Sequence, residues 1–340
     1  MANPVLETPP KITIGVTEAC PLRCRHCYAN CAAAPKPGEL SAEQWIALLD
    51  DLAGRGIIQA YFEGGEPLIK PGIKSIIEAA AASMMTLLRT HGWGLTPAVA
   101  GALAAAGLGR ALVDLMGAED ATHDAASEVR GSFVQACNAV RHLVSAGIAT
   151  DVLVVLTRQT APQLGAIARL AAELGAERLG ILRLYPLGRA RQHWTQLALS
   201  LPEQMDALNF LQAPPGLGIM QSWHPNNHNC CWQAAAINAF GRAIGCMYLR
   251  EYVDFGDATT TPYDEIFRRN PLYRQLRSGD VEANCSACSA SQGSHGGCRS
   301  TAYAWHGRWT APDPFDIALN DGLDLTMLPP ERPHVSALDA

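Results

Sequence analysis

The sequence predicts an α/β protein with parallel strands, and three observations lead to that fold class. Short β-branched runs alternate with helical segments six times within the first 190 residues. A helix between successive strands makes the strands parallel and their crossovers right-handed. Apolar residues make up 48% of the 340 residues, enough for a large core. The alternation alone fits either a partial six-unit barrel or a doubly wound open sheet.

The individual elements follow from local signals. Strands are expected over 11–17, 57–62, 84–89, 111–115, 151–157 and 179–184. Ser41 to Gln44 has the form of a capping box, apolar residues follow at helical spacing, and Gly54 can end that helix. Further helices are expected over 73–82, from Thr96-Pro97 onward, over 133–146 with Ser132 as its cap, and over 162–174.

The alternation stops after Arg189, and this sets the expected domain boundaries. Residues 1–190 should form the barrel, 191–223 a linker with a bridging helix, 224–318 an irregular cysteine-rich domain and 319–340 an extended tail. An irregular segment is poorly held by an apolar core alone, and bound metal can supply the missing stability.

Composition excludes several kinds of partner. The net charge is −6 without any basic block, which argues against nucleic acid as a main partner. No run of 18 apolar residues is present to span a membrane, and the first residues lack a secretory signal pattern. We therefore expect a cytoplasmic protein, in which the eleven cysteines indicate metal binding or catalysis more than disulfides.

The cysteines fall into three groups and one single residue. Four lie within 20–31, three within 230–246 and three within 285–298. Cys137 stands alone and shares a helical face with Phe133, so we expect a buried thiol that behaves as a small apolar residue.

The first group has the spacing C-x₃-C-x₂-C, through Cys20, Cys24 and Cys27, directly after the first expected strand. Three thiolates can hold a four-iron cluster and leave one iron open to bind another molecule. The alternative is a structural zinc site with Cys31 as fourth ligand. A second motif, Gly64-Gly65-Glu66-Pro67, follows the second strand. Both motifs fall at the carboxyl ends of parallel strands, where sites form in such folds.

These two motifs together resemble those of the radical S-adenosylmethionine (SAM) enzymes. The resemblance implies a partial barrel, a [4Fe–4S] cluster on the three cysteines, and a Gly64–Pro67 stretch that holds the methionyl amino group of SAM. His26 would lie beside the adenine, with a plain surface histidine as the alternative. Later stretches resemble the family too, namely His123-Asp124, Arg130–Phe133 and Leu184–Arg189. Thr90-His91-Gly92 and Val113–Gly117 stand at corresponding places but depart from the family pattern at His91 and at Leu115-Met116, which bears on the substrate and not on the cluster. The cofactor-binding residues implied are His26, Tyr28, Gly64, Gly65, Glu66, Pro67, Thr90, Asp114 and Arg130.

The C-terminal cysteines resemble the SPASM or twitch extension, which carries one or two auxiliary [4Fe–4S] clusters. Cys231, Gly241 and Cys246 fit the opening of that signature. Ser294 and Asp316 stand where a full signature has cysteines, and Asp316 can ligate iron through oxygen. The implied auxiliary ligands are Cys230, Cys231, Cys246, Cys285, Cys288, Cys298 and Asp316. Zinc bound by Cys231, Cys246, Cys285 and Cys288 remains the alternative.

The resemblance implies an enzyme that cleaves SAM reductively to a 5′-deoxyadenosyl radical, which abstracts hydrogen from the substrate. The leading substrate class is a ribosomally made peptide, and a flavodoxin- or ferredoxin-type protein would donate the electron. The first strand begins near residue 11 and leaves no room for an N-terminal peptide-recognition domain, so a separate recognition protein would replace it. The alternatives are a small molecule of porphyrin or aminoglycoside type, or a non-catalytic metal-binding protein. The intact Cys20, Cys24, Cys27 and Glu66 argue against the last.

Overall fold

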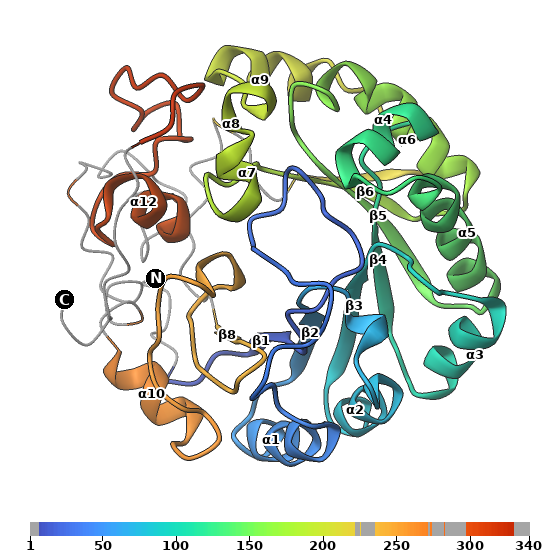
Figure 1. Ribbon diagram of the computed structural model, residues 1–340, viewed down its shortest axis with the longest axis vertical. Coiled ribbons are helices and arrows are strands. Elements are labelled where there is room, and N and C mark those ends of the chain that lie inside the picture. Colours follow the sequence, from blue (N-terminus) through green and yellow to red (C-terminus); the bar gives the residue numbers. More distant parts are fainter. Residues whose placement is uncertain are drawn as a thin grey trace.

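The computed structural model describes residues 7–221, 235–270 and 297–329, together with the single positions 225, 273 and 282. Within these described ranges, eight parallel strands form one open sheet in the order β7-β6-β5-β4-β3-β2-β1-β8. The strands lie at the centre of the molecule with helices around the outside (Figure 1). The expected α/β class and its six parallel strands are therefore confirmed, and one further strand extends the sheet at each edge.

The bounds differ from the expected ones by a few residues at most. The strands are β1 Lys11–Gly15, β2 Gln59–Glu63, β3 Met85–Thr90, β4 Arg110–Asp114, β5 Ala149–Val155, β6 Arg178–Leu182, β7 Gly218–Gln221 and β8 Ala236–Ile237. The outer helices are α1 Ala42–Gly54, α2 Ile73–Ala81, α3 Pro97–Ala105, α5 Ser132–Ser145 and α6 Leu164–Glu173. Beyond β6 lie α7 Gly188–Gln192, α8 Trp194–Leu197, α9 Leu201–Asn209, α10 Tyr263–Arg269 and α12 Arg299–His306.

The helix caps show where local reasoning succeeds and fails. Ser41 and Gln44 form the expected capping box of α1, and the Thr96 side chain accepts from the Val99 amide at the start of α3. Ser132, however, does not cap α5: Gly131 occupies the N-cap position. The carboxylate of Asp124 accepts from the backbone amides there instead, so a side chain outside the helix replaces the expected cap.

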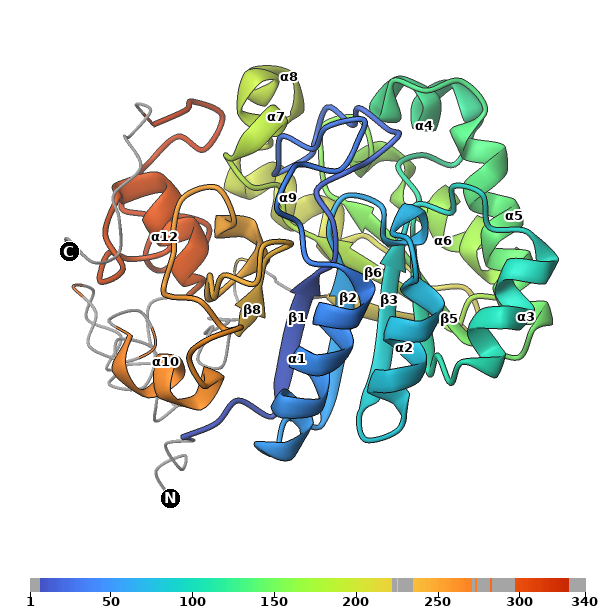
Figure 2. The same ribbon diagram turned by 60° about the horizontal axis from the view of Figure 1, so that its bottom comes forward.

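The core lies between the sheet and its outer helices. Side chains such as Ile12, Phe62, Leu88, Val154 and Ile181 are at most 1% exposed. Cys137 also belongs to this core, as expected from its helical face. Figure 2 shows the loops that follow the strands gathered at one end of the sheet, above the strand arrows.

Four elements carry no strong sequence signal. Helix α4, Asp120–Ser127, is short and polar, and α7, α8 and the two-residue strand β8 are shorter still. Their sequences lack the apolar periodicity that marks the outer helices. Within the described residues, no helix is both long enough and apolar enough to cross a bilayer.

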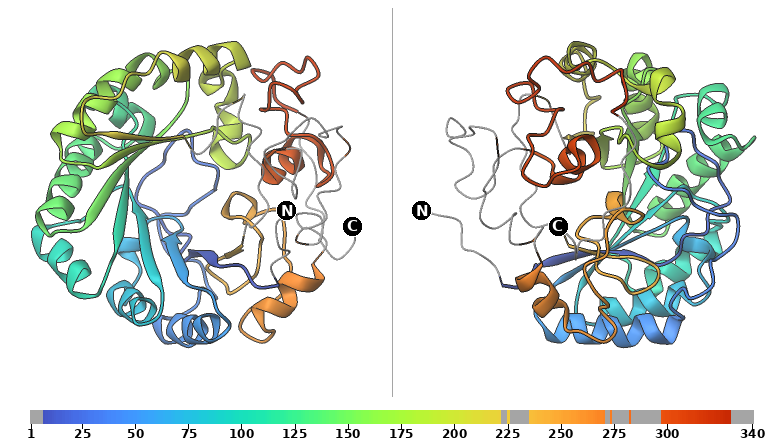
Figure 3. Two further views of the ribbon diagram at one scale, coloured as in Figure 1. Left: turned by 180° about the vertical axis from the view of Figure 1, so that it is seen from behind. Right: turned by 60° about the vertical axis from the view of Figure 1, so that its left-hand side comes forward.

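The C-terminal segment lies along the open side of the sheet. Helices α10 and α12 stand on the side of β8 in the views of Figures 1 and 3. The tail is not extended where it is described, because 319–329 forms turns. Its backbone accepts from the indole of Trp194 at Leu325 (2.9 Å) and from Arg191 at Pro329 (2.6 Å).

Candidate active site at the carboxyl ends of the strands

A cavity opens at the carboxyl ends of the strands. Its floor includes the last residues of β2 to β6, and its wall is the loop between β1 and α1 that carries the first cysteine group. Its place at the carboxyl ends of parallel strands is where sites form in such folds. The lining side chains with chemistry of their own are Cys20, Cys24, His26, Cys27, Tyr28, Cys31, Glu63, Arg89, Thr90, His91, Asp114, His123, Arg183, Tyr185, Tyr248 and Arg250.

The cysteine loop is fastened by backbone bonds to elements that the sequence did not reveal. The amides of Arg23 and Arg25 donate to the carbonyls of Ser127 and Ala126 at the end of α4 (3.0 and 2.9 Å). The amide of Ala190 in α7 donates to the carbonyl of Cys27 (2.9 Å). These short helices therefore set the shape of the loop.

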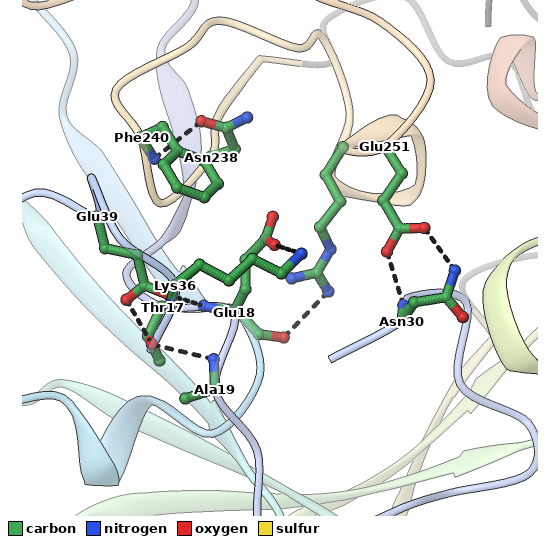
Figure 4. Close-up of polar contacts among 11 residues, drawn as sticks. Thr17, Glu18, Ala19, Asn30, Lys36, Glu39, Asn238, Phe240 and Glu251 are labelled. Carbon is green, nitrogen blue, oxygen red and sulfur yellow. Dashed lines mark hydrogen bonds and ion pairs between the residues drawn. The ribbon is translucent and has the colours of Figure 1, made fainter. Parts of the chain in front are cut away.

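Side chains complete this fastening from the other side. The carboxylate of Glu251 accepts from the amide and the side-chain nitrogen of Asn30, at 2.6 and 2.7 Å. Glu39 accepts from the Thr17 hydroxyl at 2.7 Å, and Glu18 pairs with Lys36. Figure 4 shows these contacts side by side, with Glu251 reaching the loop from the C-terminal segment. The loop is thus clamped between the barrel and that segment.

Gly64 and Gly65 lie against the backbone of the cysteine loop. A Cβ atom at Gly64 would stand 2.4 Å from the Thr17 carbonyl oxygen, and one at Gly65 would stand 2.0 Å from that of Ala19. The Gly65 amide donates to the Thr17 carbonyl at 2.7 Å. Only glycine permits this approach, which brings the backbone of the second motif to the cavity wall beside the cysteines.

Glu66 lies beneath the cavity and not on its surface. Its carboxylate is fully buried and accepts from the Thr90 hydroxyl (2.7 Å) and the amides of Leu68 and His91 (2.9 and 3.0 Å). His91 Nε2 stands 3.1 Å from the same carboxylate and 3.4 Å from Cys20 Sγ. Pro67 is buried at the start of a short 3₁₀ turn. Glu66 therefore ties the glycine motif to Thr90 and His91.

Asp114 faces the cavity as part of an ion pair. The guanidinium of Arg89 binds its carboxylate with three contacts of 2.9–3.2 Å. The hydroxyl of Tyr28 donates to Glu63 at 3.0 Å, and Glu63 also lies 3.9 Å from Arg89. The polar floor of the cavity is therefore largely charge-compensated within the protein.

The stretch from His123 to Phe133 serves the local structure. The amide of Met116 donates to His123 Nδ1 at 3.0 Å, and Asp124 accepts from the backbone at the start of α5. Arg130 is exposed and is not among the side chains that line the cavity. Its expected contact with the cofactor has no support in this geometry.

Burial and neighbouring groups shift the pKa values of the cavity. Burial raises the pKa of the Cys20 thiol to about 12 and that of Cys24 well above its usual range. The Cys31 thiol, hydrogen-bonded to Cys27, lowers the pKa of Cys27. Burial lowers the pKa of His26 to about 4, so this imidazole is neutral at pH 7. Two of the three motif thiols thus stay protonated until a metal displaces the proton.

The residues present fit an iron–sulfur cluster and SAM. Three thiols spread along one wall of a cavity suit a polynuclear cluster, because each thiolate can bind a different iron. The backbone of Gly64 and Gly65 stands beside them, free of side chains. His26 lines the same cavity.

A stack of tyrosines joins this cavity to the C-terminal cysteines. The rings of Tyr185 and Tyr248 stack with centroids 3.7 Å apart, and Tyr28 meets Tyr248 edge-on at 4.6 Å. The hydroxyl of Tyr185 lies 3.7 Å from Cys298 Sγ, and Cys246 comes two residues before Tyr248. Cys246 and Cys298 are free thiols beside this stack.

Asp316 is the remaining expected auxiliary ligand within the described residues. Asp316 is 4% exposed, and its carboxylate accepts from the Ala318 amide at 2.9 Å. Cys230, Cys231, Cys285 and Cys288 lie outside the described residues.

Several cavity residues had no signal in the sequence. Arg89, Arg183, Tyr248 and Arg250 come from β3, the residue after β6 and the turn after Cys246. The position of Tyr248 and Arg250 just after Cys246 is the one local hint, because residues next to a metal ligand often face the metal site.

Two family models match the chain. The radical SAM superfamily model covers residues 14–171, which include the cysteine loop, and the iron–sulfur cluster-binding SPASM model covers residues 230–289. The chain is therefore a radical SAM enzyme, a class that carries a [4Fe–4S] cluster and SAM. More narrowly, it is a radical SAM enzyme with a SPASM domain, which implies auxiliary iron–sulfur clusters. The zinc alternatives lose their support accordingly.

Curated relatives agree over nearly the whole length. An AdoMet-dependent heme synthase of Nitratidesulfovibrio vulgaris is 28% identical, covering 88% of this chain and 90% of that protein. A mycofactocin maturase of Mycobacterium ulcerans is 29% identical, covering 91% and 88%. A PqqA peptide cyclase of Streptomyces rochei is 26% identical, covering 92% and 91%. Similarity at this level extends across both domains.

Solved structures support the fold. The structure of Streptococcus suis SuiB bound to S-adenosylmethionine superposes with a TM-score of 0.72, at 16% identity, over 87% of this chain and 74% of that chain. The shared architecture supports the partial barrel with a C-terminal extension.

Proposed function

We propose that this enzyme is a maturase that modifies a ribosomally made peptide. The observation that carries the proposal is the cavity itself, in which Cys20, Cys24 and Cys27 face the Gly64–Gly65 backbone and the C-terminal segment closes the side. Two of the similar proteins are named as a maturase and as a peptide cyclase, which supports a peptide substrate.

Each part of the site has a proposed task. The three cysteines hold the cluster, which with SAM supplies the 5′-deoxyadenosyl radical when bound. The Gly64–Gly65 backbone holds the methionyl ammonium, while Glu66 positions that backbone together with Thr90 and Pro67. His26 and Tyr28 border the adenosyl group, and Asp114 fixes Arg89 on the floor. The closed wall excludes water from a reactive intermediate.

The auxiliary ligands form a separate proposal. Cys231, Cys246 and Cys298, joined by Cys230, hold one cluster, and Cys285 and Cys288 with Asp316 hold a second. The alternative is a single cluster on Cys231, Cys246, Cys285 and Cys288. Iron and sulfide analysis after anaerobic reconstitution decides between them, because about twelve irons mean three four-iron clusters and about eight mean two. An Asp316→Ala variant that keeps every iron and an unchanged spectrum would exclude Asp316 as a ligand.

The proposed function is tested in two stages. Anaerobic protein with SAM and dithionite should release 5′-deoxyadenosine, and absence of that product would contradict radical chemistry. Short peptides encoded beside the gene are then tested for a change in mass. A porphyrin substrate is the second candidate, because one similar protein is named a heme synthase. Turnover of porphyrin without any peptide modification would reverse the preference.

The wider setting follows from the same proposal. We place the enzyme in the cytoplasm, where a reducing environment keeps cysteines available for clusters. A flavodoxin- or ferredoxin-type donor would supply the electron, and a separate protein would present the peptide. The proposed division of the chain is a barrel over 1–190, a bridge over 191–223, an auxiliary-cluster domain over 224–318 and a tail over 319–340.

A further inference from the structure

The Arg250 side chain lines the cavity, and its guanidinium forms only some of the hydrogen bonds that it can donate. It ends the short turn that follows Cys246, and it is only 6% exposed. Its Nη2 atom donates to the carbonyl of Gly64 at 3.1 Å. Its Nε and Nη1 atoms are buried and have no hydrogen-bond partner among the residues that the structure describes. Buried N–H donors of this kind are costly to leave unpaired, so a ligand that satisfies them gains binding energy.

The other arginines of the cavity are already matched. Arg89 binds Asp114 with three contacts, and Arg183 binds Asp313 at 2.7 Å. The negative charge of Glu63 also attracts Arg250, but the Glu63 carboxylate already accepts a hydrogen bond from the Tyr28 hydroxyl. Within the described part of the cavity, Arg250 is thus the arginine without a carboxylate of its own.

The guanidinium is held in a fixed orientation. It lies over the ring of Tyr28, with its central carbon 4.9 Å from the ring centroid. One edge is anchored on Gly64. Nε and Nη1 lie on different edges of the guanidinium plane, and Nη2 carries a second N–H beside one of them. A two-donor fork that includes Nη2 is therefore still available, and such a fork matches the two oxygens of a carboxylate.

We propose that Arg250 is a carboxylate receptor of the active-site cavity. The inference rests on the proposed radical SAM function and names a residue that the motifs do not. The carboxylate has two sources: the methionyl group of SAM, because Arg250 touches the glycine backbone beside the cluster loop, or the substrate, because tyrosine rings line the same wall. In either case a residue of the C-terminal segment completes a binding site of the barrel.

The first arm of the test measures SAM binding to the anaerobically reconstituted protein. The dissociation constants of SAM and of decarboxylated SAM are compared in wild type and in Arg250→Gln. If the carboxylate comes from SAM, the ratio of the two constants should shrink roughly ten- to a hundredfold in the variant. Any contact between the SAM carboxylate and iron is the same in wild type and in Arg250→Gln, so it does not change the difference between their two ratios.

The second arm uses SAM-loaded protein and a matched pair of aromatic probes. N-acetylphenylalanine carries a carboxylate, and N-acetylphenylalanine amide differs only there. Saturation-transfer NMR should show binding of the acid in preference to the amide in wild type, with the preference lost in Arg250→Gln. This outcome assigns the receptor to the substrate.

Controls separate the inference from its alternatives. Arg242→Gln alters an arginine of the same segment that pairs with Asp254 and Asp257 away from the cavity, and it should leave both arms unchanged. Arg250→Lys keeps the charge without the planar fork and should fold while retaining only part of the discrimination. Iron content is measured for each variant, because loss of iron in Arg250→Gln would assign the guanidinium to cluster retention and overturn the proposal.

SAM binding by the wild-type protein distinguishes failure of the proposed function from failure of the Arg250 proposal. A wild-type protein that binds no SAM contradicts the proposed function. A wild-type protein that binds SAM, with both arms unaffected by Arg250→Gln, leaves the function intact and refutes the carboxylate receptor.

Discussion

The barrel and the C-terminal segment are stabilised in different ways. The barrel has six central strands in continuous register and an apolar core between sheet and helices. The C-terminal segment, in its described parts 235–270 and 297–329, has a two-residue strand and short helices. Apolar side chains such as Phe267 and Trp305 join the same core, and buried polar groups fix the segment further. Arg183 pairs with Asp313, and Arg299 donates to the carbonyls of Trp309 and Ala311 at 2.6 and 2.7 Å. Both regions thus share one apolar core, but regular secondary structure orders the barrel, whereas short elements with specific polar contacts order the segment.

The largest expected effect is the loss of the barrel cluster alone, with the iron of the C-terminal segment retained. Cys24→Ala should abolish 5′-deoxyadenosine formation and remove the barrel cluster, while auxiliary iron stays bound, since the other cysteine groups lie more than 200 residues away in sequence. The measurements are product analysis and iron content. Cys137→Ala, in the core of α5, is the matched control and should keep both. Wild-type turnover by Cys24→Ala would refute the radical SAM site.

A backbone change should damage the barrel site almost as strongly. Gly65→Ala puts a Cβ atom within 2.0 Å of the Ala19 carbonyl oxygen, so the cysteine loop must move. We expect loss of most cluster incorporation, measured by iron content and by visible absorbance. Gly54→Ala at the end of α1 meets no atom within 4 Å and should retain the cluster. Equal incorporation in the two variants would show that the loop tolerates the shift.

The ion pair between Arg183 of the barrel and Asp313 of the C-terminal segment should contribute measurably to stability. Asp313→Ala removes the carboxylate that binds the 5%-exposed Arg183 at 2.7 Å, and breaking a buried pair in this way costs about 3–5 kcal/mol. Urea unfolding followed by tryptophan fluorescence measures the loss. Asp51→Ala removes one of two carboxylates that bind the half-buried Arg55 just after α1, since Asp264 remains, and should cost about 1 kcal/mol or less. Similar losses in both variants would show that burial does not raise the cost of breaking the Arg183–Asp313 pair.

The smallest effect concerns a histidine of the barrel. Burial lowers the pKa of His123 to about 4, against 6.5 when exposed. The unfolded chain therefore binds the proton more tightly, so stability falls as the pH drops from 6.5 to 4, by about 1.4 kcal/mol per unit and up to about 3 kcal/mol.

His123→Asn isolates this effect. Asparagine can still accept from the Met116 amide but does not titrate, so its unfolding free energy should depend less on pH over that range. The difference between wild type and variant is the quantity to measure. Parallel pH profiles would mean that His123 stays neutral in both states or titrates normally.

The features that the sequence predicted correctly depend on residues close together in the chain. The capping box of Ser41 and the Thr96 cap involve residues three apart, and both are confirmed. The six strands follow from apolar runs, and the order of the sheet follows from the crossovers. The prediction that Ser132 caps α5 was wrong. Asp124 in α4 supplies the acceptor for the backbone amides at the start of α5.

Long-range packing determined the parts that could not be predicted. The sequence placed the Glu66 carboxylate at the rim, whereas the glycines before it let the chain pass under the cysteine loop and bury that carboxylate. Arg250 reaches Gly64 across 186 residues of sequence, and no local pattern carries that information. The motif resemblance identified the chemistry, but the walls of the cavity come from tertiary contacts.

The clamp on the cysteine loop also bears on how the protein is made. Synthesis proceeds from the N-terminus, so Cys20 to Cys27 emerge early. Their loop is secured only when Ala126, Ala190 and finally Glu251 have taken their places, the last 221 residues after its partner Asn30. The first site to leave the ribosome is therefore among the last to acquire its shape. We therefore expect that a nascent chain ending before Glu251 would not hold the barrel cluster.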